Sequence, residues 1–394
     1  MPFSTTAPDA TDSSLPPVEP ADLRGVRVAL VHDWLTGMRG GEKVLDALLE
    51  LVPDAAVFTL LHVAGAVSPR IEARRPRASF VQYLPAAKRR YRWYIGLFPT
   101  AVEQFDLDAF DLVLSTSHCA AKSVVATGRA RHLCYCHTPM RYAWDQFDNY
   151  FGRQRVGPLR NRVFRLAFSR LARWDAATAG RVDRYVANSN HVAERIRRYY
   201  NRESTVVYPP VDTTFYCPNG SPPGSYFLIV SALVPYKRID MAMEACRLAG
   251  VPLRIAGDGP ERARLQALAG PGVEFVGWRS DEELRELYRG ARAFLLPGEE
   301  DFGIAPVEAL ACGRPVVGLA RGGVTETVSD GATGVLVDEP VAEAYAAGIA
   351  RAAALPFDAE YIRKQALRFS RRRFHDEMRR LIEETARQVG GAAA

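Results

Sequence analysis

The sequence lacks long hydrophobic runs, and its beginning lacks the pattern of a secretory signal. No stretch of about 18 consecutive apolar residues occurs, which argues against a membrane-spanning helix. The first 22 residues are polar and rich in proline, without the basic and apolar regions of a signal peptide. We therefore expect a cytoplasmic protein with a disordered tail over residues 1–22.

Cysteine is also scarce, with 6 among 394 residues. So few cysteines in a chain of this length do not form a disulfide framework, and we expect free thiols. Cys134 and Cys136 precede His137, but no second pair at zinc-like spacing follows. Buried positions in a strand explain the two cysteines better than metal ligation, so no metal is assigned to them. Neither a metal nor another cofactor is expected for the chain.

The charge is basic and unevenly distributed. The formal net charge is +6, although the first 22 residues carry four acids and no base. Two blocks concentrate the cations: residues 70–92, which end in KRRYR beside Trp93 and Tyr94, and residues 153–173, which hold seven arginines and no acid. Either block could face an anionic surface.

The length predicts two domains, because single cores stop growing beyond roughly 250–300 residues. Short apolar runs alternate with helix-like segments, a pattern typical of a mostly parallel sheet. The expected strands are residues 26–31, 57–61, 112–115, 133–135, 185–187 and 206–208, and then 226–230, 253–256, 273–276, 293–296, 316–319 and 335–337. We predict an α/β fold of two doubly wound domains, residues 23–210 and 226–356, with a linker at 211–225 and helices at 357–390 that pack back on the first domain.

Ligands of open α/β sheets bind beyond the carboxyl ends of the strands, so the loops after strands hold the candidate residues. Gly40 and Gly41 stand at an expected helix start, where backbone N–H groups can hold a phosphate. A helix start alone explains one glycine equally well. Lys237 and Arg238 follow the first strand of the second domain, where phosphate binding and simple solvation are about equally good interpretations.

Two later loops complete the set. Gly257 and Gly259 let the backbone pass close to a ligand, although a tight turn is the simpler interpretation. Glu300 and Glu308 flank Gly303, which permits a sharp turn into a helix. Ionised carboxylates accept hydrogen bonds from sugar hydroxyls, whereas a surface acid and a helix-start acid would explain Glu300 better than Glu308.

At these residues the sequence resembles a known family. The pattern E-x7-E around Phe-Gly, followed by GRPVVGLARGGVTETVSDGATGVLV, is similar to the donor half of family 4 retaining glycosyltransferases with the GT-B fold. The amino-terminal half contains GGE, CHTPMRYAWD and ANSNHVAERI, which are similar to the acceptor half of mannosyltransferases in that family. The resemblance covers nearly the whole chain and implies two Rossmann-like domains that face each other across a cleft.

The resemblance also implies where a nucleotide sugar is bound. Its diphosphate is expected to face Gly40, Gly41 and Lys237. Glu300 is expected to hold the transferred sugar, and His137 to lie beside the reacting face of that sugar. Backbone N–H groups that assist Glu300 are those of Phe302, Gly303 and Ile304.

The remaining assignments concern the nucleoside and the acceptor. Glu308 resembles the carboxylate that binds the ribose hydroxyls, and Arg279 and Asp281 fall where the base is read. Further expected donor contacts are Arg238, Gly257 and Gly259, and the expected acceptor contacts are Arg141, Trp144 and Asp145.

One departure from the family pattern concerns the charge of the leaving group. The family often has an arginine five residues before the lysine, where this chain has Ala232. Lys237, Arg238 and the helix N-termini are the candidates to stabilise the departing diphosphate instead. The resemblance implies transfer with retention through same-face attack, in which the departing phosphate takes the proton of the acceptor.

Two other features have competing interpretations. Asp106 and Asp108 spell D-x-D, the metal motif of another glycosyltransferase fold, but they precede a strand, so a solvated turn is favoured. A helix over residues 153–174 would place Phe164, Ala167, Phe168, Leu171 and Trp174 on one stripe, which suits packing inward and lying on anionic lipid about equally well.

We therefore predict a GT-B glycosyltransferase that moves a hexose, mannose from GDP-mannose in the first instance, onto a glycan or a polyprenyl-linked acceptor. It is expected in the cytoplasm, with a peripheral contact to the inner membrane face as one interpretation of the basic blocks. A UDP-sugar or ADP-sugar transferase of the same fold is the nearer alternative. The alternative of another class is a nucleotide-binding or nucleic-acid-binding protein without transferase activity, although no nucleic-acid-binding motif accompanies the cations.

Overall fold

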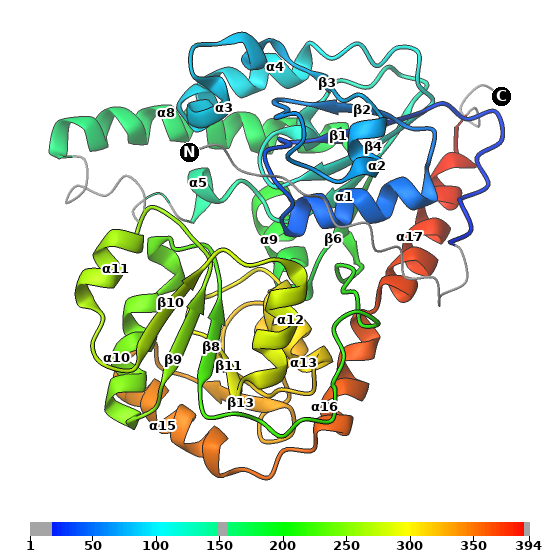
Figure 1. The fold of residues 1–394 in the computed structure, drawn as a ribbon. Helices are drawn as coiled ribbons and strands as arrows, with labels where there is room; N and C mark the ends of the chain where they lie inside the picture. The colour runs from blue at the N-terminus through cyan, green and yellow to red at the C-terminus, as the bar shows by residue number, and fades with distance from the viewer. Residues whose placement is uncertain (1–17, 146, 148–156, 390–394) are drawn as a thin grey trace. The chain divides into compact units, whose positions relative to one another are not determined.

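The computed structural model describes residues 18–145, 147 and 157–389, and the chain forms two compact units (Figure 1). The first unit comprises Met1–Pro210 and Phe374–Ala394, and the second comprises Val211–Arg373. Each unit contains one parallel sheet with helices on both faces, which confirms the predicted α/β class. All six cysteines are free, and Cys134 and Cys136 are buried in a strand, as expected.

The first unit is built on a seven-stranded sheet with the order β3-β2-β1-β4-β5-β6-β7. Its strands are β1 (Val28–His32), β2 (Ala56–Thr59), β3 (Arg77–Ala78), β4 (Leu112–Ser117), β5 (Arg131–Cys136), β6 (Arg184–Ala187) and β7 (Ser204–Val206). Its α-helices are α1 (Gly40–Leu51), α2 (Pro69–Ala73), α3 (Ala87–Arg90), α4 (Phe98–Glu103), α5 (Arg141–Trp144), α8 (Pro158–Ala177), α9 (Asn190–Tyr200) and α17 (Arg371–Ala386). Short 3₁₀ turns are η1 (Phe80–Tyr83), η2 (Tyr91–Leu97), η3 (Ala121–Ser123) and η4 (Thr178–Arg181).

Alternate residues of the central strands supply two separate cores. Leu30 of β1 packs with apolar residues of α1 and α17 on one face of the sheet. Ala29 and Val31 of the same strand pack with residues of α4, α8 and η2 on the other face. Because both faces are covered, the strands are apolar without interruption, which is why short apolar runs predicted them.

The second unit has a six-stranded parallel sheet with the order β10-β9-β8-β11-β12-β13. Its strands are β8 (Phe227–Val230), β9 (Leu253–Ala256), β10 (Val273–Gly277), β11 (Ala293–Leu296), β12 (Val316–Leu319) and β13 (Gly334–Val337). Its helices are η5 (Pro235–Lys237), α10 (Ile239–Ala249), α11 (Arg262–Leu268), α12 (Asp281–Gly290), α13 (Ile304–Ala311), α14 (Val324–Thr327), α15 (Ala342–Ala354), α16 (Ala359–Ala366) and η6 (Leu367–Phe369). Helices α10 and α15 cover one face, and α12, α13 and α16 cover the other.

Three segments differ from the sequence-based expectation. Within the predicted tail, Val18 and Ala21 pack against the first core, and the N–H of Ala21 donates to the carbonyl of Leu51; residues 1–17 lie outside the described part. The predicted linker at 211–225 belongs to the second unit, because Tyr216 is buried in its core. Helix α16 also belongs to the second unit, since Ile362 and its neighbours pack there, and the first unit takes the chain from residue 374 onward.

Strand β3 was not predicted, because it has two residues, of which Arg77 is exposed. No helix in the described ranges combines the length and the apolar content that a bilayer span requires.

Candidate functional site

Each sheet has one point where the strand order reverses, and some of the candidate residues lie in the loops that follow the strands at that point. In the second unit β8 and β11 are neighbours, while β9 and β12 lie on their outer sides. In the first unit β1 and β4 are neighbours in the same way. Loops that leave two such strands diverge and open a crevice at the carboxyl edge of the sheet, where ligands of doubly wound folds bind.

In the second unit this point holds an ion pair between Lys237 and Glu300. Lys237 ends η5, which follows β8, and Glu300 lies in the loop after β11. The ammonium of Lys237 contacts Oε1 of Glu300, and the two side chains are 14% and 16% exposed. Sequence reasoning assigned both residues but could not show that they touch, because their contact depends on the adjacency of β8 and β11.

Glycine allows these two loops to approach each other. A Cβ atom on Gly298 would lie 2.6 Å from the carbonyl oxygen of Tyr236 and 2.9 Å from Cα of Lys237, so a larger residue would push the loops apart. The sequence contains Gly298 beside Glu299 and Glu300, but it does not reveal which backbone the glycine meets.

The pair Gly322-Gly323, in the loop after β12, supports the backbone of Glu300 and was missed in the sequence analysis. Gly322 pairs with Glu300 as an isolated bridge, and a Cβ on Gly322 would lie 2.3 Å from the Glu300 carbonyl oxygen. The N–H of Gly323 donates to the same carbonyl at 2.8 Å. The dipeptide Gly322-Gly323 was the available signal for this close approach.

Gly303 turns the chain from this loop into α13. Its φ is +85°, a left-handed conformation that glycine adopts without strain, and it is the residue that precedes Ile304 at the helix start. Phe302 is buried against Phe369, with ring centroids 5.5 Å apart. The N-terminus of α13 is thus anchored beside the Lys237–Glu300 pair.

Glu308 lies on α13 and is buried, with a partner that sequence reasoning missed. The hydroxyl of Tyr288 on α12 donates to Oε2 of Glu308 at 2.8 Å. Burial, and then the nearby Glu308 carboxylate, raise the pKa of Tyr288 well above its ordinary value, so this hydroxyl remains a donor. A buried tyrosine usually needs such a polar partner, but sequence alone does not identify it.

The other predicted donor contacts have local structural roles. A Cβ on Gly257 would lie 2.0 Å from the carbonyl oxygen of Ser231, and one on Gly259 would lie 2.4 Å from that of Leu233. Both glycines are therefore required by packing of the loops after β8 and β9. Arg238 is exposed with a φ of +50° and lies 3.8 Å from Asp240.

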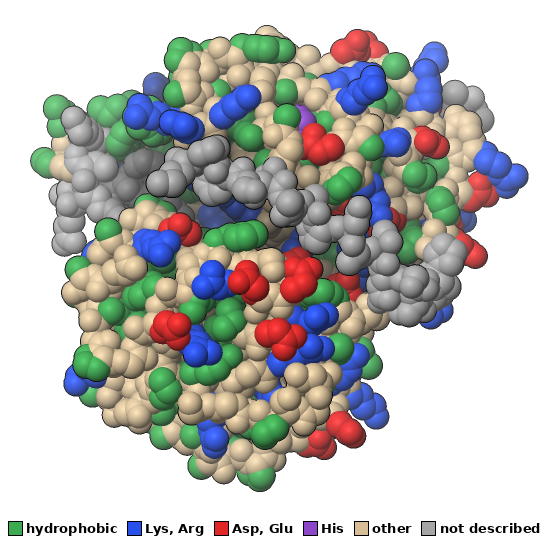
Figure 2. All heavy atoms as spheres, viewed as in Figure 1, with side chains coloured by type: hydrophobic (Ala, Val, Ile, Leu, Met, Phe, Trp, Pro, Cys, Tyr) green, Lys and Arg blue, Asp and Glu red, His purple; other side chains and the backbone are tan. Residues whose placement is uncertain are grey.

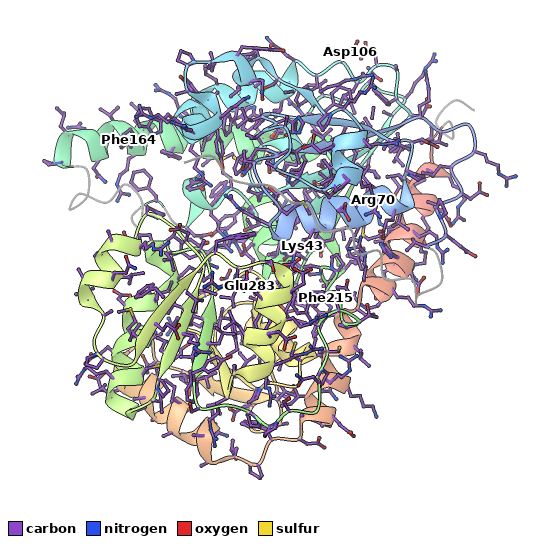
Figure 3. All side chains as sticks on the ribbon, viewed as in Figure 1. Lys43, Arg70, Asp106, Phe164, Phe215 and Glu283 are labelled. Atoms are coloured by element: carbon purple, nitrogen blue, oxygen red, sulfur yellow. The ribbon has the colours of Figure 1, made fainter. Side chains whose placement is uncertain are left out.

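Arg279 and Asp281 border α12. Nε of Arg279 lies 3.7 Å from Oε1 of Glu283, one of the residues labelled in Figure 3. Oδ1 of Asp281 accepts a hydrogen bond from the hydroxyl of Tyr216 at 3.3 Å. The contact of Asp281 helps to dock the 211–225 segment on the second unit.

In the first unit the reversal point is organised by a buried carboxylate. Asp33, which follows β1, accepts four backbone hydrogen bonds from residues 118–121 after β4, at 2.6 to 2.9 Å. Nδ1 of His118 lies 3.2 Å from Oδ2 of the same aspartate. Asp33 was not predicted, although its place directly after a strand was the available signal.

Two histidines lie close to Gly41, near the start of α1. A Cβ on Gly41 would lie 3.4 Å from Cε1 of His32 and 3.7 Å from Nε2 of His137. Nδ1 of His32 is 2.7 Å from Oγ1 of Thr116, and burial lowers the pKa of His32 to about 3, so the ring is neutral near pH 7. Gly40 is the first residue of α1, as predicted, while the contact with His32 was not foreseen.

His137 directly follows β5, and its backbone is held on both sides. Its N–H donates to the carbonyl of Ser117 at 2.8 Å, and its own carbonyl accepts from Nδ2 of Asn188 at 2.9 Å. Its ring packs edge-on against that of Tyr135, with centroids 5.2 Å apart. The side chain therefore has a fixed position at the carboxyl edge of the sheet.

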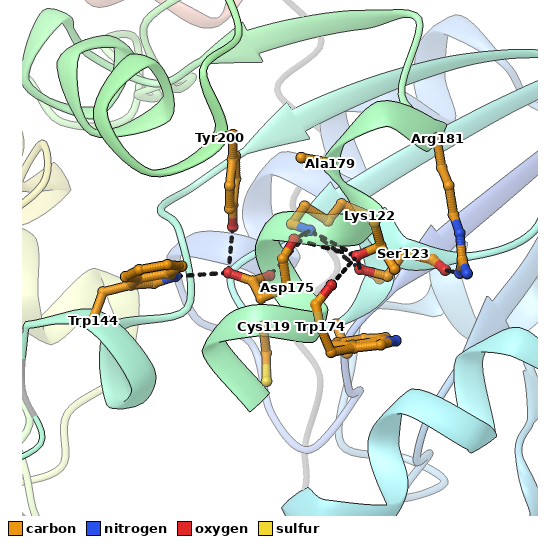
Figure 4. Close-up of polar contacts among 12 residues, drawn as sticks. Cys119, Lys122, Ser123, Trp144, Trp174, Asp175, Ala179, Arg181 and Tyr200 are labelled. Atoms are coloured by element: carbon orange, nitrogen blue, oxygen red, sulfur yellow. Dashed lines mark hydrogen bonds and ion pairs between the residues drawn. The ribbon is translucent and has the colours of Figure 1, made fainter. Parts of the chain in front are cut away.

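The predicted acceptor residues lie on or next to α5 and are tied to the first unit. Nε1 of Trp144 donates to Oδ2 of Asp175 at 2.8 Å, as Figure 4 shows, and its ring stacks on Tyr199 at 4.6 Å. Asp145 pairs with Arg195. Arg141 is the first residue of α5 and is half-buried.

Asp175 also belongs to a buried charge pair that sequence reasoning missed (Figure 4). Nζ of Lys122 lies 3.0 Å from Oδ1 of Asp175 and donates to the carbonyl of the same residue at 2.7 Å. The hydroxyl of Tyr200 donates to Oδ2 at 2.9 Å. This pair links η3, α8, α9 and, through Trp144, α5.

The D-x-D sequence lies in the loop before β4, where Figure 3 labels Asp106. Oδ1 of Asp106 accepts the N–H of Asp108 at 3.3 Å, a local turn. Within the described residues no group of three or more His, Cys, Asp or Glu side chains has an arrangement suited to a metal ion.

Two protein-family models match this chain, one over most of each unit. Residues 38–215 match the model "Glycosyltransferase Family 4", and residues 219–369 match "Glycosyl transferases group 1". A D-inositol 3-phosphate glycosyltransferase of Mycobacterium sp. (strain KMS) is 33% identical over 182 residues, 40% of this chain and 41% of that protein. One of the same name from Acidothermus cellulolyticus is 30% identical over 231 residues, 50% and 52% of the two chains. These matches thus span about half or less of the curated relatives.

Solved structures support the fold over most of the chain. HepE from Anabaena, in complex with UDP-glucose, superimposes with a TM-score of 0.66 and 18% identity over 91% of this chain and 99% of that one. Sucrose-phosphate synthase from Thermosynechococcus elongatus gives 0.61 and 18% over 93% and 100%. With family models matched by both units, the chain belongs to the family 4 glycosyltransferases of the GT-B fold.

Proposed function

We propose that the protein is a retaining glycosyltransferase that moves a hexose from a nucleotide sugar onto a glycan or lipid-linked acceptor. The family membership supports sugar transfer, and the Lys237–Glu300 pair at the reversal point of the second sheet is the observation that carries the proposal. GDP-mannose is the first donor to test, because the amino-terminal motifs resemble those of mannosyltransferases. UDP-glucose is the second, because HepE was solved with it.

The chemistry that we propose begins with the leaving group. As the glycosidic bond breaks, the nucleoside diphosphate gains negative charge, and a fixed cation in a partly buried site stabilises that charge. Lys237 supplies this cation, and its ion pair with Glu300 fixes the position of the ammonium group. When the diphosphate binds, it replaces Glu300 as the ion-pair partner of Lys237. The Glu300 carboxylate then accepts hydrogen bonds from hydroxyl groups of the sugar.

The other residues have supporting roles in this proposal. Glu308 is oriented by its hydrogen bond from Tyr288 and accepts hydrogen bonds from the ribose hydroxyls. The N-terminus of α13 adds N–H donors beside Glu300. The family resemblance assigns further donor contacts to Gly40, Gly41 and His137. Retention follows from attack on the same face, with the departing phosphate as the base.

The experiment measures turnover of GDP-mannose, UDP-glucose and ADP-glucose by the wild type and by Glu300→Gln and Lys237→Met. Each substitution should lower kcat/KM about 100-fold or more, as expected for removal of a preorganised electrostatic group. Glu299→Gln, in the same loop but with an exposed side chain, and Lys364→Met, on α16, are the matched controls and should keep activity near that of the wild type.

Three results would count against the proposal. Wild-type activity in both site variants would place the chemistry elsewhere. An inverted anomeric configuration in the NMR spectrum of the product would reject same-face attack. Tight oligonucleotide binding with a steep salt dependence, and no turnover of any donor, would favour the nucleic-acid alternative.

The acceptor is tested separately. Inositol phosphate belongs in the acceptor panel beside oligosaccharides and polyprenyl-linked sugars, because the curated relatives act, by name, on D-inositol 3-phosphate.

A further inference from the structure

Helix α8 has two apolar faces, and one of them is exposed. The stripe predicted from the sequence packs inward: Phe168 and Leu171 are buried, and Phe164 and Trp174 pack against the same core. The departure is Ala167, which is exposed. Packing inward is thus the outcome for most of the predicted stripe.

The opposite face of α8 carries different apolar residues. Leu159, Val163 and Leu166 are 76%, 59% and 54% exposed, and their i, i+4, i+7 spacing places them on one side of the helix. Single exposed leucines are ordinary, but three in a row on one helix face mark an interaction surface.

Cations border and continue this apolar row. Arg162, Arg170 and Arg173 are exposed on the same side, and none has an ion pair with an acid in the described part of the chain. The single acid of α8 is Asp175, which is buried in the network with Lys122. Arg153 and Arg155 of the predicted block lie outside the described residues.

A second cluster of the same kind lies on α3 and η2. Trp93 is 74% exposed beneath the guanidinium of Arg90, at 4.5 Å, and Leu97 is also exposed. Ala87 and Tyr91 at the base of this cluster pack in the same core as Phe168 of α8. Figure 2 shows cationic and apolar side chains together at the upper left, over the region where Figure 1 draws α3 and α8.

We propose that the exposed face of α8, with the α3–η2 cluster beside it, docks the protein on a bilayer that contains anionic lipids. The apolar row would enter the boundary between headgroups and acyl chains, while arginine side chains extend to the phosphates. Tryptophan and arginine together are typical of a membrane interface. A nucleic acid would use the cations but would gain nothing from three exposed aliphatic side chains.

The proposal does not depend on sugar transfer, because vesicle binding requires no donor and no acceptor. The test is sedimentation of the full-length protein with vesicles of phosphatidylcholine alone and of phosphatidylcholine with phosphatidylglycerol. Binding should require the anionic lipid and weaken as salt is added. Loss of each cation should weaken it about fivefold, so Arg162→Gln, Arg170→Gln and Arg173→Gln together should lower affinity on the order of 100-fold.

The apolar row is tested by Leu159→Ser, Val163→Ser and Leu166→Ser in one variant, which should lower affinity at least about tenfold. Leu248→Ser with Leu268→Ser, exposed leucines of the second unit, is its control. For the charge variant the control is Arg129→Gln, Lys364→Gln and Arg372→Gln, which removes three exposed cations elsewhere. Controls that lose binding as strongly as the α8 variants would overturn the proposal.

A second measurement leaves α8 unchanged, so its result does not depend on whether the α8 variants fold. Brominated lipids should quench the fluorescence of the wild type more than that of Trp93→Phe. No sedimentation with anionic vesicles, tighter binding to a mixed-sequence oligonucleotide than to vesicles, or a dimer that Leu166→Ser dissociates would each overturn the proposal.

Discussion

At the scale of single residues, the buried carboxylate of Asp33 has a structural role in the first unit. It accepts four N–H groups from one loop, so that the loops after β1 and β4 are joined at the reversal point. Asp33→Asn would replace an acceptor oxygen by a donor that faces other donors. The free energy of unfolding of the first unit should fall by about 3 kcal/mol.

Urea unfolding followed by tryptophan fluorescence measures this loss. Asp54→Asn is the control, because the Asp54 side chain is fully exposed, and it should be neutral. Equal midpoints for the two variants would show that the four hydrogen bonds contribute little.

Tyr288 is the residue whose role is most specific to the proposed donor. Tyr288→Phe removes the hydrogen bond to Glu308 but keeps the ring, so the fold should survive while the carboxylate loses its orientation. KM for the donor should rise about tenfold with kcat nearly unchanged, which corresponds to the loss of one hydrogen bond to a charged group. Tyr361→Phe, at an exposed position, is the control. A fall in kcat with unchanged KM would contradict a role in donor binding.

At the scale of elements, the start of α13 depends on the left-handed conformation of Gly303. An alanine there would be strained, and its Cβ would lie 2.9 Å from Cγ of Pro306. Gly303→Ala should destabilise the second unit by about 1–2 kcal/mol and displace the helix N-terminus beside Glu300, so that donor turnover falls at least about tenfold.

Gly331→Ala is the control that distinguishes backbone strain from a specific effect on donor turnover. Gly331 has a φ of +75° in the same unit, and the closest atom to an added Cβ is a side-chain nitrogen of Arg351 at 3.5 Å. The control should lose stability without a matching loss of turnover. If both variants lose activity equally, local strain alone explains the effect.

Elements and residue positions were largely predictable from the sequence, whereas contacts were not. Buried parallel strands are continuous apolar runs, so 12 of the 13 strands among the described residues could be located, and β3 was missed because two residues carry no periodic signal. Lys237 and Glu300 could each be placed after a strand, but their ion pair follows from strand order. Tyr288, His32 and Lys122 were missed because their partners are distant in sequence.

At the scale of the whole molecule, the two units should respond differently to acid. All seven histidines of the chain lie in the first unit. Burial lowers the pKa of His32 and that of His118 to about 3 and the pKa of His132 to about 4, from an ordinary value of 6.5. Below pH 6.5 these histidines are protonated in the unfolded chain but remain neutral in the folded unit. The free energy of unfolding of the first unit therefore decreases as the pH falls.

The magnitude follows from the linkage between proton binding and folding. Between pH 7.5 and 5.0 each of these three histidines should cost the first unit about 2 kcal/mol. Glu42 acts in the opposite direction, because burial raises its pKa from 4.5 to about 7, so the folded state binds a proton first as the pH falls. That gain is about 2 kcal/mol over the same range, which leaves a net loss of about 4 kcal/mol.

Calorimetry at the two pH values, with tryptophan fluorescence to assign the transitions, tests this expectation. Four of the five tryptophans lie in the first unit, so fluorescence should follow the transition that moves to lower temperature, while that of the second unit stays in place. Glu42→Gln removes the opposing group and should enlarge the loss at pH 5.0 to about 6 kcal/mol. Equal shifts of both units, or a smaller shift in the Glu42 variant, would contradict this account, because the second unit contains no histidine and the sign of the Glu42 contribution is set by its raised pKa.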